Sequence, residues 1–330
     1  MKKLLLAVAL LASGIAASAV QDSSRKDDKG ASARPSSKVV NAEQLLEDVR
    51  ILSADAMEGR ATGTPGAAMA RAFIKKRFGD AGLSPLGASF ESAFRLSIGK
   101  GEKSLKDEPT GVNLVGYVPG KSHPARFIVV TAHYDHLGVK RGQIYNGADD
   151  NASGVAALLQ LAAHFNRERP NNSIIFAALD AEEINLVGAF ALVAQLKAEK
   201  RDLVLNVNLD MVSHSDRGEL YAAGSHHTPK LRPLLEQVAA RAPVKLLIGH
   251  DRPEQAQDDW TKQSDQYAFH GAGIPFVYFG VENHKDYHKP SDDIETITTG
   301  FFVHAAETIL DVVKTLDANL QPISNKKRSD

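Results

Sequence analysis

The sequence of 330 residues contains no cysteine. This absence excludes disulfide bonds, thiolate metal sites and cysteine nucleophiles. Any metal ion must therefore be bound by histidine and carboxylate side chains, a donor set that accepts zinc, manganese or cobalt.

The chain also lacks an excess of charge of either sign. It has 39 lysines and arginines against 40 aspartates and glutamates, which gives a net charge of −1. We therefore expect neither a nucleic-acid surface nor electrostatic capture of acidic partners. Hydrophobic residues make up 43% of the chain, enough to bury the core of one large α/β domain or of two small ones.

The first 19 residues are predicted to form a cleaved signal peptide. Two lysines are followed by a short apolar run and by Ala17-Ser18-Ala19, a small-x-small cleavage pattern. The apolar run is too short to span a membrane comfortably, and no cysteine follows it that could carry a lipid anchor. We expect an exported protein, periplasmic or secreted, without membrane attachment after cleavage.

The remaining chain is expected to contain a single domain at residues 39–320. Residues 20–38 are polar and have little to bury, which predicts a disordered tether, and residues 321–330 form a charged tail. From about residue 112 onward, apolar strands alternate with helices. This alternation predicts an α/β three-layer sandwich with a mostly parallel mixed central sheet and helices on both faces. We further expect residues 111–118 to form a hairpin with the central strand at 126–132, and residues 218–224 to be an edge strand.

Residues able to bind metal follow the predicted strands. Four apolar strands, at 126–132, 173–179, 203–209 and 275–279, end in or before such residues, and a further carboxylate lies between the first strand and its helix. In chain order these residues are His133, Asp150, Glu182, Glu183, Asp210 and His288. Singly, each could be a helix cap or a structural histidine. If the strands are parallel, all of them meet at one edge of the sheet.

The number of candidate ligands indicates two metal ions. Two histidines and three carboxylates exceed the ligands of one tetrahedral zinc. They suit two ions about 3.5–4 Å apart that share a bridging carboxylate and activate one water molecule. Without metal these carboxylates would repel each other, so we expect metal to stabilise the fold.

The motifs around these residues resemble those of the M28 family of dizinc aminopeptidases, and the likeness runs from about residue 57 to residue 316. They are Ala132-His133-Tyr134-Asp135, Gly147-Ala148-Asp149-Asp150-Asn151-Ala152-Ser153-Gly154, Ala181-Glu182-Glu183, Leu209-Asp210-Met211 and Asp286-Tyr287-His288. The earlier loop from Met57-Glu58-Gly59-Arg60 to Gly66 resembles the family's N-terminal signature. The zinc-exopeptidase fold is the one that this resemblance implies.

The resemblance assigns the ligands of the two ions, which it implies to be Zn²⁺. Asp150 would bridge them, His133 and Asp210 would complete one site, and Glu183 and His288 the other. The implied activity is hydrolysis of N-terminal residues from peptides with a free N-terminus, by a hydroxide that bridges the ions.

Two further roles are implied beside the metal ligands. Glu182 would be the general base, taking a proton from the water and giving it to the leaving amine. Asp135 would accept the second ring N–H of His133 and fix its tautomer. Residues i and i+2 of a strand share a face, so these two side chains are expected to approach each other.

Some residues depart from the family pattern. Gln266 follows Asp265 where the family has histidine, and Asp265 either supports the site or caps its helix. The remaining histidines considered match no ligand position and are expected at the surface or the rim: His136, His214, His226, His227 and His284.

Other functions stay open at this point. A glutaminyl cyclase of the same fold would use one zinc, and a carboxypeptidase or dipeptidase would carry an inserted lid or a basic residue for the substrate carboxylate. A catalytically inactive binding domain would have lost a ligand or the base. A serine hydrolase is disfavoured because no Gly-x-Ser-x-Gly elbow is present. The substrate side-chain preference and the oligomeric state are not predicted.

Overall fold

The computed structural model describes residues 36–96 and 110–320. The predicted signal peptide, most of the predicted tether and the predicted tail lie outside these residues. In the two described ranges, no helix combines the length and the apolar character that a membrane crossing needs.

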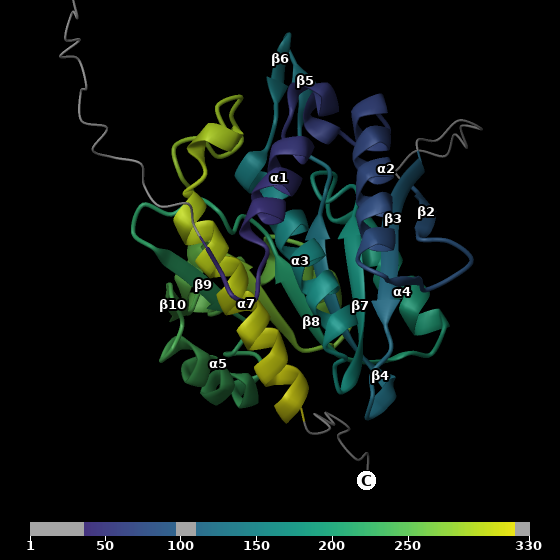
Figure 1. The fold of residues 1–330 in the computed structure, drawn as a ribbon, viewed down its shortest axis with the longest axis vertical. Helices are drawn as coiled ribbons and strands as arrows, with labels where there is room; N and C mark the ends of the chain where they lie inside the picture. Colours follow the sequence, from purple (N-terminus) through teal and green to yellow (C-terminus); the bar gives the residue numbers. More distant parts are fainter. Residues whose placement is uncertain (1–35, 97–109, 321–330) are drawn as a thin grey trace, which may run out of the picture. The chain divides into compact units, whose positions relative to one another are not determined.

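A central sheet of nine strands organises the described residues (Figure 1). Its strand order is β1-β3-β7-β4-β8-β11-β9-β10, with β2 paired against β3. The strands are β1 (Ser84–Pro85), β2 (Glu91–Arg95), β3 (Thr110–Val118), β4 (His123–His133), β7 (Asn172–Leu179), β8 (Asp202–Leu209), β9 (Glu219–Ala223), β10 (Lys245–Ile248) and β11 (Phe276–Gly280). A separate pair joins β5 (Gly138–Lys140) to β6 (Gln143–Tyr145).

The sheet is mixed, and its centre is parallel. Strands β7, β4, β8 and β11 run parallel to one another. Strand β3 is antiparallel to β7, and β9 is antiparallel to β11. The prediction of a mostly parallel mixed sheet is confirmed for the strands that carry the candidate ligands.

Helices cover both faces of the sheet because the central strands are apolar on both faces. The helices are α1 (Ala42–Leu52), α2 (Pro65–Asp80), α3 (Gly154–Arg167), α4 (Val187–Ala198), α5 (Arg232–Ala239), α6 (Gln266–Gly271) and α7 (Thr299–Asn319). Along β4, Ile128 and Val130 belong to the core shared with α1, α2, α3, α5 and α7, whereas Phe127 and Val129 face α4 and α6. The predicted three-layer sandwich is therefore the observed architecture.

Two details of the predicted topology are wrong. Residues 111–118 do not form a hairpin with the central strand, because β7 lies between β3 and β4 and pairs with both. Strand β9 is not an edge strand, since β10 pairs with its outer side. Both errors arise because strand order depends on long-range packing that the local pattern does not encode.

A fully buried arginine joins the N-terminal region to the central loops. Arg60 donates hydrogen bonds to the main-chain oxygens of Leu52, Tyr134, Asn146 and Gly147, at 2.6–2.9 Å. Burial lowers the pKa of Arg60 to about 10, so the guanidinium remains charged at neutral pH. It therefore fixes the loops on either side of the segment that leads to Asp150.

We expect Arg60→Met to destabilise the fold by at least about 3 kcal/mol, because four buried carbonyl groups lose their donor. Urea unfolding of the variant and the wild type in metal-free buffer measures the difference in their free energies of unfolding. Arg50→Met is the matched control, because Arg50 pairs with Glu47 on an exposed face of α1 and should leave the unfolding midpoint unchanged. Equal midpoints for Arg60→Met and the wild type would contradict the role of Arg60.

Candidate metal centre

All six predicted side chains meet at the carboxyl edge of the parallel strands. His133 is the last residue of β4, Glu182 and Glu183 follow β7, and Asp210 follows β8. Asp150 lies in the turn before α3, and His288 lies in the loop after β11. Parallel strands bring their carboxyl ends to one edge, which explains how residues 155 positions apart in the chain become neighbours.

Asp150 lies between two histidines. Its Oδ1 is 3.4 Å from His133 Nε2, and its Oδ2 is 3.1 Å from His288 Nε2. His133 Nε2 also lies 3.3 Å from Asp210 Oδ1, and His288 Nε2 lies 3.6 Å from Glu183 Oε1. The two oxygens of Asp150 thus face two separate groups of ligand atoms, as a bridging carboxylate requires.

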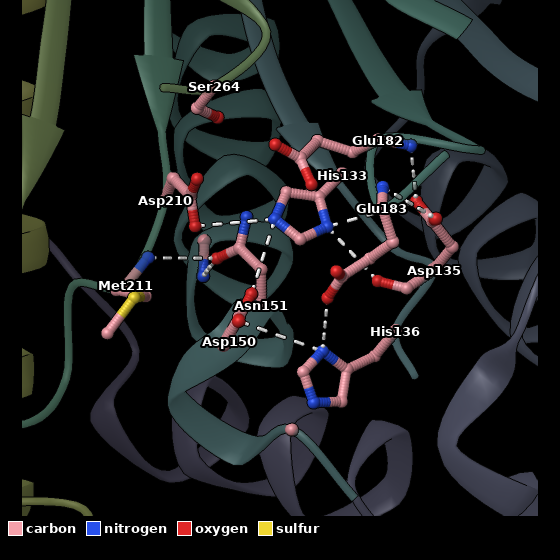
Figure 2. Close-up of polar contacts among 12 residues, drawn as sticks. His133, Asp135, His136, Asp150, Asn151, Glu182, Glu183, Asp210, Met211 and Ser264 are labelled. Atoms are coloured by element: carbon pink, nitrogen blue, oxygen red, sulfur yellow. Dashed lines mark hydrogen bonds and ion pairs between the residues drawn. The ribbon is translucent and has the colours of Figure 1, made fainter. Parts of the chain in front are cut away.

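His136 belongs to this centre, although it was expected at the surface or the rim. It is only 2% exposed, and its Nδ1 lies 2.8 Å from Glu183 Oε1 and 3.7 Å from Asp150 Oδ2 (Figure 2). His136, Asp150 and Glu183 could hold one ion between them. The only sequence signal was its place three residues after His133, in the same segment.

Asp135 orients the centre in a way that differs from the expectation. His133 Nδ1 lies 3.0 Å from the main-chain oxygen of Asp135, whereas the Asp135 carboxylate is 3.8 Å away (Figure 2). That carboxylate accepts the main-chain N–H groups of Glu182 (3.1 Å) and Glu183 (3.3 Å). The main chain of Asp135 thus holds His133, and its side chain holds the Glu182-Glu183 pair.

Glu182 lies in the group formed by His133 and Asp210. Although part of its side chain faces the pocket, burial raises the pKa of Glu182 well above its usual range. His133 opposes this shift, and the carboxylates of Asp210 and Asp265 add to it. A higher pKa makes the ionised carboxylate a stronger base than that of an exposed glutamate.

The histidines partly balance the negative charge. Burial lowers the pKa of His133, but the carboxylates of Asp210 and Glu182 outweigh it and raise that pKa well above the usual value. The pKa of Asp150 is lowered, because the neighbouring histidines, chiefly His136 and His288, outweigh its burial. Positive charge is therefore favoured at this position.

Several buried polar atoms of the centre make no hydrogen bond, which indicates whether the centre fits metal ions. His136 Nε2 is buried without a hydrogen-bond partner among the described residues, and His136 Nδ1 and Glu183 Oε1 make no hydrogen bond there either, although they lie 2.8 Å apart. Leaving such groups unpaired is unfavourable, and a divalent ion would satisfy them. Imidazole and carboxylate donors on two sides of one bridging carboxylate fit a pair of divalent transition-metal ions.

Asp292 supports the loop that carries Asp150. Its two carboxylate oxygens accept the main-chain N–H groups of Asp149 and Asp150, both at 3.0 Å. Burial and the nearby Asp149 raise the pKa of Asp292 to about 7. No sequence pattern singled out Asp292, because its partners are 142 and 143 residues away.

Asp265 does not cap its helix, so that alternative is wrong. Its side chain makes no capping hydrogen bond to α6, and neither oxygen has a hydrogen-bond partner in the described part of the chain. Burial raises the pKa of Asp265 to about 7. Gln266 accepts a hydrogen bond from Asn208 (3.0 Å) and donates one to the main-chain oxygen of Trp260 (2.6 Å), so it holds the segment that forms one wall of the pocket.

The centre opens into a cavity of about 240 Å³. Besides the six predicted residues, its lining consists of Met211, Trp260, Gln263, Tyr278, Val281, Asn283 and Tyr287. No lysine or arginine of the described ranges is among the lining residues. The pocket therefore combines a floor of carboxylates and histidines with walls that include three aromatic rings, those of Trp260, Tyr278 and Tyr287.

The fold and the site together define an α/β protein with a histidine–carboxylate metal centre at the carboxyl edge of its sheet. Residues 113–313, more than half of the chain, match the sequence profile of peptidase family M28. The chain belongs to this family, which confirms the resemblance inferred from the motifs.

Curated relatives are similar to part of the chain. The aminopeptidase YwaD of Bacillus subtilis is 32% identical over 200 residues, which cover 57% of this chain and 41% of that protein. A probable zinc metalloprotease of Pyrenophora tritici-repentis is 28% identical over 218 residues, covering 57% and 49%. The chain thus matches less than half the length of either relative.

Solved structures confirm the fold. The chain is similar to BSAP, a zinc aminopeptidase of Bacillus subtilis, with a TM-score of 0.66 at 18% identity over 82% of this chain and 94% of that one. It is equally similar to a glutaminyl cyclase of Porphyromonas gingivalis, with a TM-score of 0.66 at 16% identity over 84% and 99%. At these identities the likeness concerns the fold alone.

Removal of metal should lower the melting temperature of the protein, because the carboxylates of the centre then repel each other. If free metal exceeds its dissociation constant 100-fold, each bound ion contributes about 2.7 kcal/mol, which corresponds to a shift on the order of 5 °C per ion. Thermal unfolding with and without a chelator measures the shift. The chelator should lower the melting temperature of the ligand variant Asp210→Asn by less than that of the wild type. A wild-type melting temperature that the chelator leaves unchanged would contradict this prediction.

Proposed function

We propose that the protein is a metal-dependent aminopeptidase that removes N-terminal residues from peptides. The observation that carries this proposal is the position of Asp150, whose two oxygens face His133 and His288, with Glu182 beside them on the cavity wall. We also propose that residues 39–320 form one peptidase domain, and that a signal peptide at residues 1–19 directs it to the periplasm or outside the cell.

The ligand assignment is the one that the family resemblance implies, and the contacts of Asp150 with His133 and His288 support it. His133 and Asp210 would hold one divalent ion, Glu183 and His288 the other, and Asp150 would bridge them. The relatives named as zinc proteins support Zn²⁺ as the metal. When bound, two such ions supply a polarising charge at the scissile carbonyl and lower the pKa of a water molecule that they share.

Glu182 is suited to move the proton in this reaction. Its carboxylate would take the proton of the attacking water and deliver it to the nitrogen of the leaving amine. The Asp135 carboxylate holds the Glu182 main chain at 3.1 Å, so the base keeps its position beside His133.

The pocket offers no basic side chain for a substrate carboxylate. Asp150, Glu183 and Asp210 line the cavity, and as metal ligands their charge would be balanced by the two ions. No lysine or arginine of the described residues lines the cavity, whereas a carboxypeptidase would need such a residue to bind the C-terminal carboxylate of its substrate. This difference supports an aminopeptidase over a carboxypeptidase.

A glutaminyl cyclase is the second candidate, because a solved cyclase is as similar in fold as BSAP. A one-zinc cyclase would need only one set of ligands. Both sets are present here, with His133 and Asp210 on one side of Asp150 and Glu183 and His288 on the other. We therefore place the peptidase first.

Mass spectrometry of mixed peptides distinguishes these activities. Peptides with a free N-terminus should lose residues stepwise from that end, while their acetylated counterparts should remain intact, and a chelator should abolish the reaction. Cyclised N-terminal glutamine would instead indicate the cyclase. Trimming from the carboxyl end would refute amine recognition and leave the metal assignment standing.

Glu182→Gln should keep its bound metal and lose turnover by about 10²–10⁴-fold, because the amide accepts no proton. Peptide hydrolysis and metal content are measured on the same preparation. Glu254→Gln, at an exposed glutamate away from the centre, is the matched control and should behave as the wild type. A near wild-type rate for Glu182→Gln would show that another group is the base.

A further inference from the structure

A second group of histidine and carboxylate side chains lies outside the proposed catalytic centre. His214 is in the loop after β8, and His284 and Asp286 are in the loop after β11. One ligand atom from each lies within 4.8 Å of the other two. His214 and His284 were expected at the surface or the rim, but His214 is only 7% exposed and Asp286 only 5%.

Two donor atoms of this group have no partner. His214 Nδ1 and Asp286 Oδ2 are buried and make no hydrogen bond to any described residue. Asp286 Oδ2 lies 4.0 Å from the ammonium of Lys285, whose side chain is 83% exposed, so this contact is long and open to solvent. Buried polar atoms normally find partners, so these two point to a ligand.

The other atoms of the group hold its members in orientation. His284 Nε2 lies 3.1 Å from Asp149 Oδ2, and a donated N–H there leaves the lone pair on Nδ1. That nitrogen receives only a long contact, 3.3 Å, from the main-chain N–H of Asp286. Ser291 donates its hydroxyl to Asp286 Oδ1 at 2.8 Å, which leaves Oδ2 free. Metal-binding histidines and carboxylates are commonly oriented in this way by a second partner.

Asp149 joins the two loops. Besides His284, its carboxylate accepts the main-chain N–H of Ser213 (2.7 Å) and the Ser213 hydroxyl (2.8 Å), next to His214. The imidazole rings of His214 and His284 are stacked, with centroids 3.8 Å apart and planes 6° apart. Because lone pairs lie in the ring planes, His214 must rotate for both rings to reach one ion. A cavity of about 270 Å³, lined by both histidines, provides the space and the access.

We propose that His214, His284 and Asp286 bind one divalent transition-metal ion, separate from the catalytic centre. Two imidazole nitrogens and one carboxylate oxygen are a donor set that zinc prefers, and the two histidines line the adjoining cavity. Through these residues, the loop after β8 would be joined to the loop after β11. The latter also carries His288, two residues beyond Asp286, so the site holds the loop of a proposed catalytic ligand in place.

Metal counting tests this site directly. Wild-type protein and variants are stripped of metal, dialysed against Zn²⁺, and their zinc per chain is determined by mass spectrometry. His214→Phe keeps a stacked ring but lacks the nitrogen, and Asp286→Asn keeps the acceptor for Ser291 but lacks the charge. Each should bind one zinc fewer than the wild type. His250→Phe is the matched control, because His250 also stacks on an aromatic ring, that of Trp260, outside the group.

The difference between wild type and variant, and not the total, decides the result. Equal zinc content in the wild type and in folded His214→Phe and Asp286→Asn would overturn the site; because the two substitutions lie on different loops, one suffices if the other does not fold. His133→Phe reports on the catalytic centre separately. Loss of zinc in His133→Phe but in neither other variant would support the catalytic centre and reject this site. Loss of zinc in His214→Phe and Asp286→Asn but not in His133→Phe would support this site and reject metal binding at the catalytic centre.

Discussion

The arrangement of negative charge around Asp150 is the constraint on which the rest of the structure depends. Loops after two strands, β7 and β8, bring Glu182, Glu183 and Asp210 to the same edge of the sheet, where burial makes their mutual repulsion costly. The fold offsets part of this cost with histidines on both sides of Asp150 and with the buried Arg60, whose charge lies near the centre. Divalent ions would offset the remainder, so metal binding and stability are expected to be linked.

The centre of the fold and most of the candidate site could be predicted because both depend on local patterns. Strands such as β4 and β7 are buried on both faces and therefore read as continuous apolar runs. In parallel strands, the residue that follows each run must lie at one edge. His133, Glu183 and Asp210 are therefore placed by secondary structure alone, without knowledge of the loops.

The features that escaped prediction depend on contacts between distant segments. Strand β7 separates β3 from β4 although it follows both in sequence, and Asp292 binds a loop more than 140 residues away. His136 was expected at the surface or the rim because its burial follows from the turn after β4 and not from any periodic pattern. For the same reason, the sequence could not show that His133 is held by the main chain of Asp135 rather than by its carboxylate.

The neighbouring residues Asp149 and Asp150 serve two different groups of side chains. Asp150 faces His133 and His288, whereas Asp149 holds Ser213 and His284. Asp292 fixes both through their main-chain N–H groups, so the two carboxylates share one rigid support. The loop after β11 touches both groups as well, through His284 and His288. A displacement of this loop would therefore alter both sites together, which makes the support of that loop, and not only the ligands themselves, a determinant of the centre's geometry.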